Sequence, residues 1–182
     1  MKINIIGAGA SEVSTYLKRK RGLKERVKRY LGKGFGKSMV LGFDYTLKEA
    51  KVKDKSIKFQ IWEMAGQPRF RTVRSVHYYG SLGFLIFYKK NDRDSFDDAI
   101  QWFDEFKKHC GTPIRRFSKD QLVLIGIIQE SESVTKEEGE KLAEQLGMSY
   151  YEMDLKNGKA IDELLYKMGE GYLWMINQCK TV

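Results

Sequence analysis

Apolar residues fall in short, regularly spaced segments along the chain, and their spacing separates strands from helices. Residues 43–52 and 56–62 alternate between apolar and polar positions, and Lys53-Asp54-Lys55 between them predicts a tight β-hairpin. Other segments are almost entirely apolar, which is typical of central strands covered on both faces. These are residues 2–6, 83–88 and 122–128, and a last short strand is predicted at 149–151.

Helical patterns lie between the predicted strands. They are residues 12–29, a run from Asp94 or Ser95 that carries Phe96, Ile100, Phe103 and Phe106, a run from Thr135 with capping-box spacing, and residues 160–177. Strand and helix therefore alternate after one early hairpin. This order predicts an α/β fold with three layers, in which about five helices flank a six-stranded, mostly parallel sheet.

Length and composition fit a single globular domain over residues 1–182. The two cysteines, Cys110 and Cys179, are too far apart in sequence for a disulfide framework or a metal-binding spacing. No apolar run approaches the roughly 20 residues that a membrane span needs, and residues 1–7 lack the pattern of a signal peptide. We therefore expect a cytoplasmic protein, with peripheral attachment to membranes as the alternative.

The segment Trp62-Glu63-Met64-Ala65-Gly66-Gln67-Pro68-Arg69-Phe70, which we call the switch-like segment, follows a predicted strand and precedes a basic, helix-like run. It resembles the Trp-Asp-Thr-Ala-Gly-Gln-Glu-Arg-Phe segment of Ras- and Rab-like small GTPases. The resemblance extends over nearly the whole chain in element order and implies the small-GTPase (P-loop NTPase) fold. It implies that the Gly66 amide senses a γ-phosphate and that Gln67 orients the attacking water. Glu63 would stand in for an aspartate that holds magnesium through water.

The phosphate-binding loop that this family uses is altered. A strand, a glycine turn and a helix N-terminus together direct backbone amides at an anion. The family pattern adds a lysine for the phosphates and a serine or threonine for magnesium. Gly7, Gly9 and Ser14 keep the pattern, but Glu12 replaces a glycine and Val13 replaces the lysine. Valine carries no charge, and a carboxylate repels phosphate. The loop therefore either only turns the chain or binds an anion weakly through its amides.

The first switch region is altered as well. Val40 stands where a threonine would bind magnesium and the γ-phosphate, and its side chain has no oxygen. Residues 32–38 end in Gly-Lys-Ser, but only three residues separate the outer glycines, and a strand rather than a helix follows. We reject this stretch as the phosphate loop. Lys33 or Lys37 would be the source of a phosphate-facing cation if nucleotide were bound.

The residues that would read guanine are replaced. The family uses Asn-Lys-x-Asp after the fifth strand, where the aspartate accepts hydrogen bonds from the base. In this chain Ile127, Ile128 and Glu130 replace the asparagine, lysine and aspartate. Of the later Ser-Ala-Lys motif only Lys156 remains. A site that depends on hydrogen bonds to a base loses discrimination when those partners disappear.

Three hypotheses remain open from the sequence. The first is a pseudo-GTPase with weak or absent GTP binding, which needs no cofactor and acts as a protein-interaction or scaffolding module in signalling or trafficking. The second is a divergent switch that binds GTP or GDP with magnesium through Ser14 and Glu63 and hydrolyses GTP with Gln67. The third is a basic domain that binds membranes or nucleic acid.

The formal net charge of +9 suggests a partner with an acidic surface. The basic patch at Lys18, Arg19, Lys20 and Arg21 is either a solvated helix face or a contact for acidic protein or an anionic membrane. Nucleic acid is the weaker candidate because no aromatic residues interleave the run. A second surface, for protein partners, is predicted in and after the switch-like segment, because arginine and tyrosine are common interface anchors. Its residues are Arg69, Arg71, Arg74 and Tyr78.

Overall fold

The computed structural model describes residues 1–19, 42–155 and 159–178. They form a six-stranded sheet in the order β2-β3-β1-β4-β5-β6. The strands are β1 (Lys2–Gly7), β2 (Phe43–Val52), β3 (Lys55–Met64), β4 (Phe84–Lys89), β5 (Leu122–Ile127) and β6 (Ser149–Met153). Every neighbouring pair is parallel except β2 and β3, which are antiparallel. The predicted six-stranded, mostly parallel sheet is confirmed.

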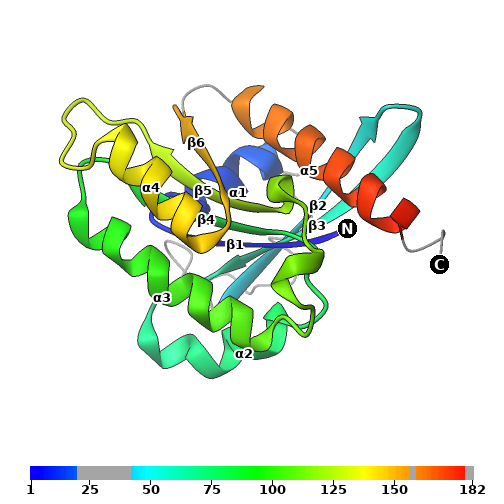
Figure 1. Cartoon of the computed structure of the whole chain (residues 1–182), viewed down its shortest axis with the longest axis horizontal. Helices are drawn as coiled ribbons and strands as arrows, with labels where there is room; N and C mark the ends of the chain where they lie inside the picture. Colours follow the sequence, from blue (N-terminus) through cyan, green and yellow to red (C-terminus); the bar gives the residue numbers. More distant parts are fainter. Residues whose placement is uncertain (20–41, 156–158, 179–182) are drawn as a thin grey trace, which may run out of the picture.

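Five α-helices occur among the described residues, and they cover both faces of the sheet (Figure 1). They are α1 (Ala10–Arg19), α2 (Arg71–Tyr78), α3 (Arg93–His109), α4 (Lys136–Leu146) and α5 (Lys159–Gln178). Short 3-10 turns are η2 (Pro68–Phe70), η3 (Ile114–Arg116) and η4 (Lys119–Gln121). This arrangement confirms the predicted three-layer α/β fold.

The core consists of two apolar clusters, one on each face of the sheet. Side chains from α1 and α5 pack in the first cluster, and side chains from α2, α3 and α4 pack in the second. All six residues of β5 are buried. Burial on both faces explains why β4 and β5 have no polar alternation in their sequences.

Local sequence chemistry sets several element boundaries. Thr135 and Glu138 form the predicted capping box at the start of α4. Lys53, in the turn between β2 and β3, has a φ of 57°, as a tight hairpin turn requires. The cap of α3 is Asp92, whose carboxylate accepts a hydrogen bond from the Ser95 amide at 3.2 Å, so the predicted cap at Asp94 or Ser95 was wrong by two to three residues.

Two helix expectations need comment. Ile100 was expected in the apolar face of α3, but it is 48% exposed, and Ala99 is buried instead. The helix predicted from residue 12 begins earlier, at Ala10. Its predicted continuation, residues 20–29, lies outside the described residues, as do the first-switch positions Lys33, Lys37 and Val40.

Candidate functional site

The loop between β1 and α1 has the backbone of a tight strand-to-helix turn. Gly7 and Gly9 have φ angles of 100° and 105°, a region that side chains with a Cβ rarely adopt. At Gly7 a Cβ would also collide with the backbone carbonyl of Phe87 on β4. The chain therefore needs glycine at Gly7 for the turn itself, whether or not an anion binds.

Val13 shows what has replaced the phosphate-binding lysine. Its side chain is 2% exposed and packs in the core with Ile3, Ile5 and Leu17. These side chains also line an apolar cavity of about 10 Å³ between the sheet and α5, a volume no larger than about one water molecule needs. At the lysine position the chain therefore supplies a core contact and no cation.

A second apolar contact covers the loop itself. Ile127, at the end of β5, is 2% exposed, and its Cδ1 lies where a Cβ on Gly9 would be. Leu155 approaches the same point, at 3.4 Å from that Cβ position. Ile127 and Leu155 thus pack over the glycine turn. The asparagine that the family uses at position 127 would need a hydrogen-bond partner in this contact.

The rest of the base-reading region is exposed. Ile128 is 44% exposed, and Glu130 is also at the surface. Lys156, the one retained residue of the later motif, lies outside the described residues.

Ser14 and Glu63, the two candidate magnesium ligands, do lie together. They are 2% and 7% exposed. Burial raises the pKa of the Glu63 carboxyl above its usual range, and the nearby Ser14 side chain offsets only part of that rise. Among the described residues, no group of three or more histidine, cysteine or acidic side chains is arranged to hold a metal ion.

The fit of this site to magnesium and GTP is therefore poor. Glu12 is exposed beside the loop amides, where its carboxylate accepts a hydrogen bond from Ser11 Oγ at 2.8 Å. It places negative charge where phosphate would approach. Val13 offers no compensating cation, and Glu63 and Ser14 are both buried. These residues do not fit a magnesium–nucleotide complex.

The predicted basic patch is only partly described. Lys18 forms an ion pair with Asp44 on β2, so part of its charge is neutralised within the protein. The side chain of Arg19, and Lys20 and Arg21 altogether, lie outside what the structure describes.

Arg74 is buried rather than available to a partner. It is 1% exposed and forms a two-pronged ion pair with Glu105 of α3, with nitrogen–oxygen distances of 2.8 and 2.9 Å. Its remaining guanidinium nitrogen donates to the carbonyls of Ala65 and Gln67 at 2.8 and 2.9 Å. Tyr78 is also fully buried. The prediction that Arg74 and Tyr78 contact a partner was therefore wrong for this conformation, because neither has exposed surface.

These bonds hold the switch-like segment against the rest of the protein. The Ala65 amide donates to the Gly42 carbonyl at 3.0 Å, and Gly66 lies against the ring of Trp102 on α3. The Arg74 guanidinium also lies 4.8 Å from the centre of that ring. Protein groups thus satisfy the amide of Ala65 and the carbonyls of Ala65 and Gln67 directly.

Gln67, Arg69 and Arg71 are exposed, as a catalytic or partner-binding role would require. Arg69 donates to the Gln67 side chain at 3.2 Å, and Arg71 lies 3.6 Å from the Glu105 carboxylate. The side chain of Gln67 therefore bonds to its own segment in this conformation.

The sequence reasoning missed an aromatic surface beside the switch-like segment. Trp62 lies between Tyr45 and His77, with ring centres 4.7 and 4.9 Å away, and Phe43 lies 4.1 Å from His77. Phe43, Tyr45 and Leu47 are 37–40% exposed on the outer face of edge strand β2. The sequence could have indicated this surface, because these three apolar residues occupy alternate positions of one strand and so share a face.

Comparison with known proteins identifies the family to which this fold belongs. The sequence model of the Ras family matches residues 25–173. The chain belongs to the Ras family. The match begins after the loop between Gly7 and Ser14, so the altered phosphate loop lies outside it.

Individual relatives point the same way. The chain is 30% identical over 146 residues to Ras-related protein SEC4 of Saccharomyces cerevisiae, which is 78% of this chain and 65% of that protein. It is 31% identical over 131 residues to GTP-binding protein ypt2 of Schizosaccharomyces pombe, 70% of this chain and 62% of that protein. With human Ras-related protein Rab-8B the identity is 28% over 141 residues, 76% and 65% of the two chains. The match thus spans less than two thirds of each relative's length. No described helix of this Ras-family chain is long and apolar enough to cross a membrane.

Proposed function

We propose that this Ras-family chain is a pseudo-GTPase that binds GTP weakly or not at all and works as a protein-interaction or scaffolding module. The observation that carries the proposal is the packing of Val13 in the core and of Ile127 over Gly9. Two features that a nucleotide needs, a cation and an open glycine loop, are replaced by apolar packing, and the aspartate that would read the base is replaced by the exposed Glu130. We therefore expect no cofactor.

A fixed switch-like segment supports the second half of the proposal. In a nucleotide-driven switch, the γ-phosphate and its magnesium order this segment, and hydrolysis releases it. In this chain Arg74 and Glu105 hold it through the carbonyls of Ala65 and Gln67. The segment thus has a shape that needs no ligand, which suits a constitutive binding surface.

The surface best suited to a protein partner combines apolar and cationic groups. Phe43, Tyr45 and Trp62 supply aromatic area. Exposed charge comes from Arg69, just before α2, and Arg71, at the start of α2, the helix whose His77 packs on Trp62. Aromatic and arginine side chains are the commonest anchors of protein interfaces. We place the module in signalling or trafficking, in the cytoplasm and partly peripheral to membranes, by analogy with its Ras-related relatives.

The alternative is a divergent switch that hydrolyses GTP. It is favoured by Gly66 and Gln67, which are retained, and by a relative whose name describes it as GTP-binding. It would need the buried Ser14 and Glu63 side chains to become accessible to magnesium.

One experiment separates the two. The purified full chain is denatured and the supernatant is analysed for guanine nucleotide, and a second sample is melted with and without Mg-GTP. We expect no nucleotide and no rise in melting temperature, since a ligand that binds the folded state must stabilise it. Stoichiometric GDP or GTP, or a clear rise with Mg-GTP, would overturn the proposal.

A further inference from the structure

Five exposed cations lie between the end of α3 and the start of β5, and we call them the basic end. They are Lys107, Lys108, Arg115, Arg116 and Lys119. Among the described residues none of the five forms an ion pair.

Only part of the basic end has a structural explanation. Lys107 and Lys108 lie in the last turn of α3, where a positive charge stabilises the helix C-terminus. The other three, Arg115, Arg116 and Lys119, lie in 3-10 turns of three residues, which have no comparable dipole. Their charges therefore repel one another without a compensating contact in the fold.

Packing brings the five cations onto one surface. The rings of Phe106 and Phe117 lie 5.9 Å apart and hold η3 against the last turn of α3. The Gly80 amide donates to the Cys110 carbonyl at 3.0 Å, which joins the end of α2 to the same loop. Tyr79 packs against Gly111 and is nevertheless 72% exposed. An exposed aromatic ring thus lies beside the cations.

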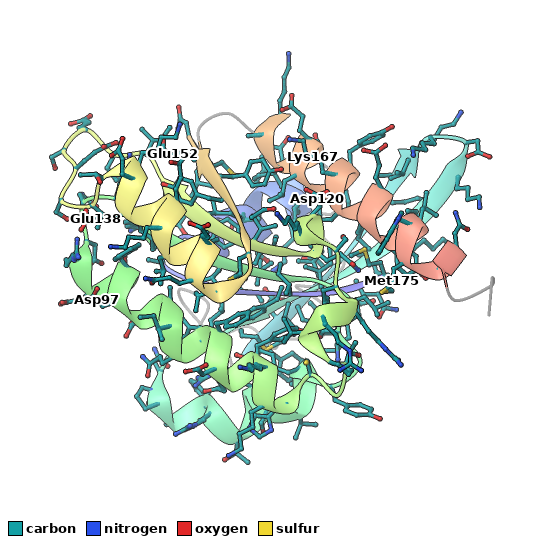
Figure 2. The ribbon with its side chains drawn as sticks, viewed as in Figure 1. Asp97, Asp120, Glu138, Glu152, Lys167 and Met175 are labelled. Carbon is teal, nitrogen blue, oxygen red and sulfur yellow. The ribbon has the colours of Figure 1, made fainter. Side chains whose placement is uncertain are left out.

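The opposite end of the molecule is acidic. Exposed carboxylates gather at the start of α3 and before and along α4: Asp94, Asp97, Asp98, Glu130, Glu132 and Glu140. Three of them form ion pairs at the same end, Asp97 with Arg93, Glu132 with Lys90 and Glu140 with Lys136. Among the described residues, Asp94, Asp98 and Glu130 form no ion pair and leave this end with excess negative charge. Figure 2 shows Asp97 and Glu138 at one end, far from Met175, which contacts Gln121 of η4. Since α3 runs from the acidic end toward the other end (Figure 1), the charges are separated along the molecule.

We propose that the basic end docks the protein onto a membrane that contains anionic lipid. A basic surface binds an acidic partner by charge complementarity. Because the acidic side chains lie at the opposite end, a broad, negatively charged membrane surface would attract the basic end and repel the acidic end, which orients the whole molecule. A peptide or a nucleic acid strand would contact only the cations of the basic end and would not respond to the charge at the opposite end. Tyr79 suits the water–lipid boundary, where tyrosine is enriched. The proposal is independent of whether nucleotide binds.

The test compares two variants with the same change in net charge. In the first, Lys107, Lys108, Arg115 and Arg116 are replaced by glutamine. In the matched control, four exposed lysines without an ion pair among the described residues are replaced by glutamine: Lys51, Lys55, Lys58 and Lys141. Full-length proteins are floated with vesicles of phosphatidylcholine, with and without 30% phosphatidylserine, at roughly physiological salt. Thermal melting shows that each variant is folded.

We expect wild type to bind only the phosphatidylserine vesicles. The first variant should lose affinity by roughly a hundredfold or more, since each cation near such a surface contributes about 1 kcal/mol. The control should stay close to wild type. If the first variant does not fold, the double variant Arg115→Gln with Arg116→Gln, outside every α-helix, should still lose roughly tenfold or more.

Several results would overturn the proposal. Equal losses in both variants would mean that binding follows net charge alone. Binding to phosphatidylserine that disappears only when Lys20 and Arg21 are neutralised would assign it to the other basic run. Absence of binding by wild type, or its complete displacement from vesicles by single-stranded RNA at equal phosphate concentration, would favour a different partner.

Discussion

The loop from Gly7 to Ser14 and the switch-like segment both follow strands of the same sheet, β1 and β3. The loop keeps its backbone turn but has lost the side chains that would serve a phosphate. The switch-like segment keeps most of its family letters, yet its backbone forms hydrogen bonds with Arg74 and Gly42 and packs near the ring of Trp102. In both regions, groups that would face a nucleotide instead stabilise the fold.

The two regions show that a motif residue can be retained either for the fold or for the chemistry of a site. Gly7 is required by its φ angle and by the Phe87 carbonyl, so it needs no ligand to explain it. A Cβ on Gly66 would meet the Trp102 ring at 3.4 Å, an ordinary contact, so packing does not require glycine there. Residues of a motif can therefore be retained because the fold needs them, even where the site has lost the side chains that would bind its ligand. The predictions below test this view, beginning with the region where the packing is strongest.

The largest effect is expected at Arg74. Replacing Arg74 with alanine leaves the Glu105 carboxylate buried without its partner and frees two carbonyls, so we expect a loss of about 3 to 5 kcal/mol in the free energy of unfolding. Urea denaturation measures the change. Arg71→Ala, in the same helix, is the control: it removes only a longer, exposed contact with Glu105, at 3.6 Å, and should cost less than about 1 kcal/mol.

A double variant sharpens the same prediction. Arg74→Met combined with Glu105→Met removes both charges, and buried pairs replaced in this way often recover stability. The double variant should therefore be more stable than Arg74→Ala. A loss for Arg74→Ala no greater than that of Arg71→Ala would show that the pair does not hold the switch-like segment.

A smaller loss is expected when the family's base-reading residues are restored one at a time. Ile127→Asn places an amide in the buried contact over Gly9, and we expect a loss of about 3 kcal/mol in unfolding free energy. Ile128→Lys restores the neighbouring letter at a position that is 44% exposed, and should change stability by less than about 0.5 kcal/mol.

The same two variants test the nucleotide site. Melting with Mg-GTP should show no rise for either variant, because the lysine position at Val13 remains apolar. A rise for Ile127→Asn would mean that the loop can still accept a nucleotide once the asparagine at position 127 is restored. That result would contradict the inference that the loop no longer binds nucleotide.

The fold was largely predictable from the sequence because it depends on periodicity. The alternating pattern of β2 and β3 and the unbroken apolar runs of β4 and β5 each correspond to one burial pattern. Ile100 was misplaced because helical spacing allowed either Ile100 or Ala99 to face the sheet, and only tertiary packing decides between them.

The site was less predictable because side-chain partners far apart in sequence determine it. The loss of lysine at Val13 could be read directly, but the packing of Ile127 over Gly9 joins residues more than 100 positions apart. Arg74 looked like a surface residue because nothing near it in sequence indicates Glu105 of α3. Burial of an arginine is rare without such a partner, so the sequence alone favoured exposure.

The smallest effect concerns Glu63, a buried carboxylate near the end of β3. Burial raises the pKa of Glu63 in the folded protein, and nearby Asp44 adds to the rise. The ionised form is therefore disfavoured by folding, so stability is greatest below the ordinary carboxyl pKa and falls as pH rises through the folded value. We expect Glu63→Gln to be more stable than wild type at neutral pH, and the difference to shrink as the solution is acidified.

Thermal melting between pH 4 and pH 8 measures this difference, with exposed Glu144→Gln as the control that should follow wild type throughout. The same melts are repeated with added magnesium. If Glu63 were a metal ligand, adding magnesium would stabilise wild type and not Glu63→Gln, because binding to the folded state raises its melting temperature. That outcome would restore a role for the Ser14–Glu63 pair in nucleotide chemistry. The same pH profile with and without magnesium would instead mean that the buried carboxylate is a cost to the fold, retained from a site that no longer binds its metal.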